Sequence, residues 1–87
     1  MDKKLNSLLM IDQEIGDFLE ENNDLSDNEI STLFEEKNFV GKALKIVQKL
    51  SNRNIIELIK RSRYLNMYID LKKYVKRYPL NKSYLKN

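Results

Sequence analysis

Apolar residues recur every three or four positions along most of this chain, the spacing that puts side chains on one face of an α-helix. The pattern is continuous over residues 3–21, where acidic residues fill the opposite face. Only two glycines and one proline occur in 87 residues, so the chain has few of the turn signals that a β-rich fold needs. We therefore expect an all-α fold, a small bundle of three or four helices. The apolar positions of this first segment are Leu5, Leu8, Ile11, Ile15, Phe18 and Leu19. Asp12 falls within the same apolar sector, and we expect it at the edge of the buried face.

The start of a second helix is marked by the sequence LSDNEI at residues 25–30. Ser26 and Glu29 have the spacing of a capping box, in which each side chain accepts a hydrogen bond from the other residue's backbone. Leu25 and Ile30 flank them at the positions of a hydrophobic staple. These signals predict a helix that begins after Ser26 and ends near residue 37 or 38.

A third helix is expected over residues 39–50, with an apolar face and a lysine face that contains no acid. Together with the preceding helix it is similar in spacing to a helix-turn-helix, which reads DNA with its second helix. Glu35 and Glu36, however, occupy the turn where that motif places small and apolar residues. A DNA-reading role for this pair is therefore only an alternative.

The last expected helix is long and C-terminal, running from Asn54 to Arg77 just before Pro79. Its apolar stripe changes sides between residues 64 and 69, which leaves two explanations. Either the helix breaks near Asn66 and both halves face the chain's own core, or the second stripe covers a partner or a second copy. We favour the interface, because tyrosine is enriched in interface cores. The candidate interface consists of Tyr64, Tyr68, Leu71, Val75 and Tyr78.

Charge is divided sharply along the chain. Residues 1–36 contain two lysines and eleven acidic residues, a net charge of −9, whereas residues 37–87 contain fourteen cations and two acids, a net charge of +12. The two halves can attract each other within one chain or between copies. Alternatively, the basic half can form a patch for the phosphates of nucleic acid. That candidate patch consists of Lys42, Lys45, Lys49, Arg53, Lys60, Arg61 and Arg63.

Several classes of function lack the residues they require. The chain has no cysteine and no histidine, and it contains no glycine-rich phosphate loop. Neighbouring acids such as Glu20 and Glu21 point about 100° apart on a helix, so they cannot flank one scissile bond. We expect no enzyme, no cofactor, no metal and no small-molecule substrate. The apolar runs are too short to span a membrane, and the amphipathic faces are too short to lie on one.

We expect a single cytoplasmic domain over residues 1–87, acidic over 1–36 and basic over 37–87, with residues 80–87 as a flexible tail. The chain resembles no family by its motifs. We expect a small regulator of the inhibitor or adaptor type, acting by protein–protein contact and self-association. The alternative is nucleic-acid binding. The frequent Lys, Asn and Ile residues indicate an AT-rich genome, which is typical of a phage, a plasmid or a similar mobile element.

Overall fold

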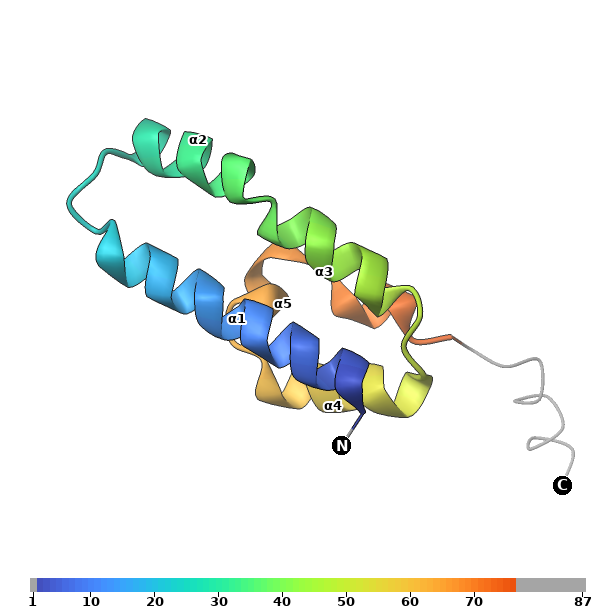
Figure 1. The fold of residues 1–87 in the computed structure, drawn as a ribbon. Helices are drawn as coiled ribbons and strands as arrows, with labels where there is room; N and C mark the ends of the chain where they lie inside the picture. Colours follow the sequence, from blue (N-terminus) through green and yellow to red (C-terminus); the bar gives the residue numbers. More distant parts are fainter. Residues whose placement is uncertain (1, 77–87) are drawn as a thin grey trace, which may run out of the picture.

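The computed structural model describes residues 2–76, and every regular element in that range is helical (Figure 1). The all-α prediction is therefore confirmed as a small helical bundle. Tyr78 and the expected tail at 80–87 lie outside the described residues. The elements are α1 (Lys3–Glu21), α2 (Asp27–Lys37), α3 (Phe39–Val47), α4 (Asn52–Arg61), α5 (Leu65–Tyr68) and the 3-10 helix η1 (Leu71–Tyr74).

The long helix α1 is the centre of the bundle. Helix α3 packs antiparallel to α1 on one side, α4 packs on another side, and η1 returns along α4 (Figure 1). One apolar cluster joins them, and burying each large aliphatic side chain stabilises the fold by about 1.5–3 kcal/mol relative to leaving it exposed. Its largest fully buried members are Leu8, Ile15, Val47, Ile55, Leu58, Leu65 and Leu71.

The prediction of a long C-terminal helix is wrong for the described residues. Helix α4 is capped by Ser51, not Asn54, and it ends at Arg61, because Ser62 adopts an extended conformation (φ −79°, ψ 147°). The break is stabilised by Asn66, whose side-chain amide donates to the carbonyls of Ile59 and Ser62, both at 2.9 Å. These bonds satisfy acceptors that the end of a helix leaves free. The chain then reverses near Asn66, which was one of the two explanations for the change of sides of the apolar stripe.

Asp12 holds this reversal to α1. Its carboxylate accepts the backbone N–H groups of Tyr64 and Leu65, both at 2.8 Å, and that of Arg63 at 3.2 Å. Helix α5 has no side-chain cap of its own. A carboxylate from α1 therefore caps the start of α5, and the expectation of a simple edge position missed this role.

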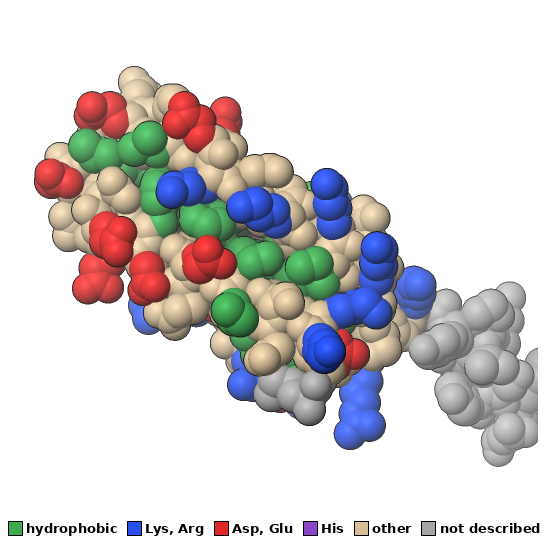
Figure 2. Space-filling view, viewed as in Figure 1, with side chains coloured by type: hydrophobic (Ala, Val, Ile, Leu, Met, Phe, Trp, Pro, Cys, Tyr) green, Lys and Arg blue, Asp and Glu red, His purple; other side chains and the backbone are tan. Residues whose placement is uncertain are grey.

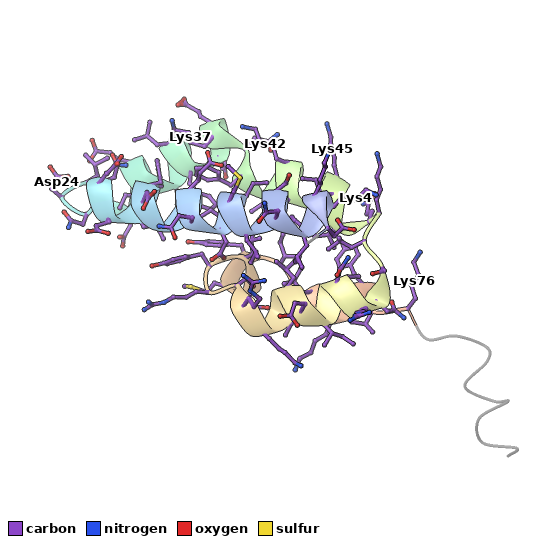
Figure 3. All side chains as sticks on the ribbon, turned by 60° about the horizontal axis from the view of Figure 1, so that its bottom comes forward. Lys4, Asp24, Lys37, Lys42, Lys45 and Lys76 are labelled. Carbon is purple, nitrogen blue, oxygen red and sulfur yellow. The ribbon has the colours of Figure 1, made fainter. Side chains whose placement is uncertain are left out.

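Asn52 fixes the end of the described chain. Its side-chain amide donates to the carbonyl of Lys76 at 2.5 Å, and its side-chain oxygen accepts from the N–H of Lys76 at 2.7 Å. This pair of bonds ties the segment after η1 to the first turn of α4. As a result, the starts of α1 and α4, the end of α3 (Figure 1) and Lys76 (Figure 3) all lie at the same end of the bundle.

Candidate functional site

Helix α2 differs from the other long helices in how little of it is buried. None of its eleven residues, all of which the structure describes, is buried. Its apolar residues Ile30, Leu33 and Phe34 remain only partly covered by the core. Figure 1 shows that α2 leads away from the rest of the bundle towards the connection with α1. The sequence predicted the helix but not its exposure.

The last turn of α2 is anchored by aromatic packing. Phe34 lies 5.9 Å from Phe18 of α1 and 5.6 Å from Phe39 of α3, measured between ring centroids. The ring of Tyr68 in α5 lies 4.6 Å from that of Phe34. Such aromatic pairs add about 0.5–1.5 kcal/mol each beyond the area they bury. The core therefore holds the C-terminal half of α2 more firmly than its N-terminal half.

Local interactions complete both ends of α2. The capping box is formed, with the Ser26 side chain accepting from the N–H of Glu29 and the Glu29 carboxylate accepting from the N–H of Ser26. The backbone hydrogen bond from Ser26 lowers the pKa of Glu29, and the Ser26 hydroxyl adds to this effect. At the other end, Lys37 lies in the last turn and Asn38 ends the helix in the left-handed conformation (φ 56°). Asparagine adopts this conformation more readily than most residues.

An isolated helix of eleven residues is only marginally stable in water, because most helical stability in proteins comes from burying one face. Helix α2 buries little, so its caps and charges supply much of what keeps it folded. The chain thus presents a preformed helix whose apolar residues are not fully used by its own core.

A shallow apolar hollow lies on the flank of α2. Leu25 and Leu33 form its apolar part, and Asn28, Glu29 and Thr32 complete its wall. Its acidic surroundings, which we call the acidic end, are formed by the end of α1, the connection and the start of α2. The exposed acids of the acidic end are Glu20, Glu21, Asp24, Asp27 and Glu29. Figure 2 shows acidic side chains gathered around this end, and Figure 3 shows Asp24 at its tip.

The charges of α1 oppose its helix dipole. The partial positive charge at a helix N-terminus favours acids, and the partial negative charge at the C-terminus favours cations. Asp2 precedes the helix and places one acid at its N-terminus, where the carboxylate accepts from the N–H groups of Lys4 and Leu5. Within α1 itself, the first turn has no acid and the last turn has no cation. Instead, Lys3 and Lys4 begin it, and Glu20 and Glu21 end it. The two acids at the C-terminus therefore cost some helix stability.

Cations gather at the opposite end of the bundle. Because α1 and α3 are antiparallel, the start of α1 lies beside the end of α3. Figure 3 shows Lys4, Lys45 and Lys76 at this end, far from Asp24, with Lys37 and Lys42 between them. We call this surface the basic end. Its exposed cations are Lys3, Lys4, Lys45, Lys49 and Lys76.

The five residues of the expected tyrosine interface do not form one surface. Leu71 is 1% exposed and belongs to the core, and Tyr64 is half-buried with its ring against Gly16 of α1. Val75 is also half-buried. Tyr68 is 41% exposed and packs on Phe34, so it alone of the four described residues presents a large exposed surface. Tyr78 is outside the described residues.

The seven residues of the expected nucleic-acid patch are divided between two places. Lys45, Lys49 and Arg53 flank the connection from α3 to α4, and Lys42 precedes them by one turn. Lys60, Arg61 and Arg63 lie at the other end of α4, about 15 Å away along a helix of this length. Figure 3 shows Lys42 and Lys45 pointing away from α4. Helix α3 also continues away from α2 rather than crossing it, unlike the second helix of a helix-turn-helix (Figure 1).

Among residues 2–76, no group of three or more acidic, histidine or cysteine side chains is placed to hold a metal ion. Over the same residues, no helix combines the length and the apolar character that crossing a membrane requires. Comparison with family models, with curated proteins and with solved structures gave no match for the chain.

Proposed function

We propose that this protein is a non-catalytic binding module that presents α2 and the acidic end to a cationic, partly apolar segment of a protein chain. The observation that carries the proposal is that α2 is a fully capped helix without a single buried residue. In this role the protein acts as a regulator of the inhibitor or adaptor type.

The chemistry of the partner follows from the surface. An apolar side chain of the partner fills the hollow beside Leu25 and Leu33, and cations next to it meet the surrounding acids. Complementary charge of this kind raises the rate of association and selects against acidic competitors. Because α2 is already helical, binding does not require the entropy loss of ordering this helix.

A site-specific cross-link tests the proposal. The chain has no cysteine, so Thr32→Cys provides a single thiol, at the hollow. A thiol-reactive photo-cross-linker attached there labels only what lies next to the hollow. With extract of the native host at low salt, we expect a discrete protein adduct that excess unlabelled protein removes. Exposed Lys60, on α4, provides the matched control as Lys60→Cys.

The variant Leu33→Gln, combined with Thr32→Cys, should lose the adduct while the circular dichroism remains helical. Equal labelling from positions 32 and 60, or an adduct that Leu33→Gln leaves unchanged, contradicts the proposal.

Nucleic-acid binding is the second candidate, and the basic end is the observation that favours it. If four or five of its cations meet phosphates, log K for duplex DNA should fall against log salt with a slope of about −4. Replacing Lys45 and Lys49 by alanine should flatten that slope by about one unit for each lost contact. The absence of a mobility shift at low salt rejects this candidate.

A further inference from the structure

The outer face of α1 carries an ordered charge pattern. Six exposed positions lie within about 40° of one direction on the helix, opposite the buried face. The stripe begins with a lysine and ends with three acids, and Met10, 63% exposed, lies near its middle. The six positions of this α1 stripe are Lys3, Ser7, Met10, Glu14, Asp17 and Glu21.

Such a stripe is complementary to itself when two copies of α1 lie antiparallel. If the two-fold axis passes beside Met10, Lys3 of one copy faces Asp17 of the other, because each is seven residues from Met10, about 10 Å along the helix. The symmetry repeats this pair on the other side of the axis. The two Met10 side chains meet at the centre, where they cover each other.

The same arrangement pairs the two ends of the molecule. The basic end, which includes Lys3, also holds Lys4, Lys45 and Lys76, and beyond Asp17 the acidic end continues to Asp24. Figure 2 shows a face with acids at one end, lysines towards the other and apolar side chains between them. Residues 2–76 contain thirteen cations and thirteen acids, so the charge that complements the acidic end is present on the same chain.

We infer that the cationic partner of the acidic end is a second copy of this chain, joined in an antiparallel two-fold pair along the α1 stripe. This inference rests on the proposed function for the partner of the acidic end alone, because the α1 stripe does not include the hollow of α2. The contact is closed, since a two-fold interface uses the same patch on both copies and leaves neither end free. It also accounts for the charges that oppose the dipole of α1, because those charges bind the other copy.

The charge pairs of this contact are exposed, and salt screens such pairs strongly. Sedimentation equilibrium of the full chain should therefore show a monomer–dimer equilibrium at low salt, weakened at least about tenfold at 0.5 M salt.

Charge reversal gives the decisive test. One variant carries Lys3→Glu and Lys4→Glu, and the other carries Asp17→Lys and Glu21→Lys. Each should remain monomeric alone, because like charges then face each other. An equimolar mixture should form a one-to-one pair. Both variants place charge as the dipole of α1 prefers, so both should keep their helicity by circular dichroism.

The control reverses two exposed charges on the far element, as Asp70→Lys with Lys72→Glu, and should dimerise like the unaltered chain. A monomer at all concentrations at low salt, a dimer that survives either reversal, or a mixture that fails to pair overturns the inference. The cross-link from position 32 distinguishes a failure of the two-fold pair from a failure of the proposed function. An adduct with a different protein upholds the proposed function without a second copy, and the loss of both results rejects both.

Discussion

At the scale of single residues, Asp12 shows how one carboxylate fixes the path of the chain. It lies among the apolar positions of α1, where its carboxylate accepts hydrogen bonds from three backbone N–H groups of residues 63–65. A buried or half-buried donor left without an acceptor costs about 1–3 kcal/mol. No local sequence signal connects Asp12 with Tyr64, which follows it by 52 residues.

We expect Asp12→Ala to lower the free energy of unfolding by about 2–3 kcal/mol, and Asp12→Asn to lower it by about half as much. The asparagine oxygen still accepts hydrogen bonds, but it lacks the charge that strengthens them. Urea denaturation measures both values. Asp70→Ala, at an exposed carboxylate outside the α1 stripe, is the control and should change stability by less than about 0.5 kcal/mol. Equal losses for Asp12→Asn and Asp12→Ala contradict the capping role.

Gly16 provides the space in which the Tyr64 ring packs. A Cβ atom at position 16 would lie 2.6 Å from Cε2 of Tyr64, which is too close. We expect Gly16→Ala to destabilise the protein by about 1 kcal/mol, although alanine is the better helix former. With Tyr64→Ala also present, the same substitution should stabilise by about 0.5–1 kcal/mol. Urea denaturation of the four proteins gives the cycle, and an effect of one sign in both backgrounds contradicts this packing.

At the scale of secondary-structure elements, the sequence predicted those helices whose signals are local. The apolar spacing of residues 3–21 and the Ser26–Glu29 box gave α1 and α2 their bounds. The break after Arg61 depends instead on Asn66 and on Asp12 of another helix, so helical periodicity alone extended α4 too far. The expected third helix was three residues too long, since α3 ends at Val47.

The folded state of α2 should depend on the charge of Glu29. Because hydrogen bonds from Ser26 lower the pKa of Glu29 from its ordinary value of 4.5, the carboxylate stabilises α2 fully above that pH. This contribution should disappear as the pH falls below the ordinary pKa and through the lowered one. Amide exchange of residues 30–34, followed from pH 6 to pH 3, should show fraying relative to α1 after correction for intrinsic rates. In Glu29→Gln, which lacks the carboxylate of the capping box, the difference between α2 and α1 should vary much less with pH.

In protein dilute enough to be monomeric, helix α1 should gain stability when its last turn is reversed in charge. Replacing Glu20 and Glu21 by lysine places cations at the negative end of the dipole, worth about 0.3–1 kcal/mol each. The melting temperature should rise by about 4–8 °C for each kcal/mol in a domain of this size. Glu14→Lys, in the middle of the helix, is the control and should give no such gain. A lower melting temperature for the end variant contradicts the dipole argument.

At the scale of the whole molecule, the fold brings together charged residues that lie far apart in the sequence. Antiparallel packing of α1 and α3 brings Lys4, from the acidic half, to the end that also holds Lys45. The sequence therefore predicted a strong charge asymmetry, but its acidic and basic segments do not coincide with the acidic end and the basic end. One usable signal was overlooked: the acids at the end of this amphipathic helix oppose its dipole.

The central claim is that local interactions, more than burial in the core, keep α2 helical. Native-state hydrogen exchange of the dilute protein tests this claim most directly. Residues 33–37 of α2 and residues 43–47 of α3 are compared, because all of these lie beyond the free N–H groups of a helix start. We expect protection factors in α2 at least about a hundredfold smaller than in α3, which is the signature of local opening. Equal protection of the two segments would mean that α2 belongs to the core, and it would contradict the account.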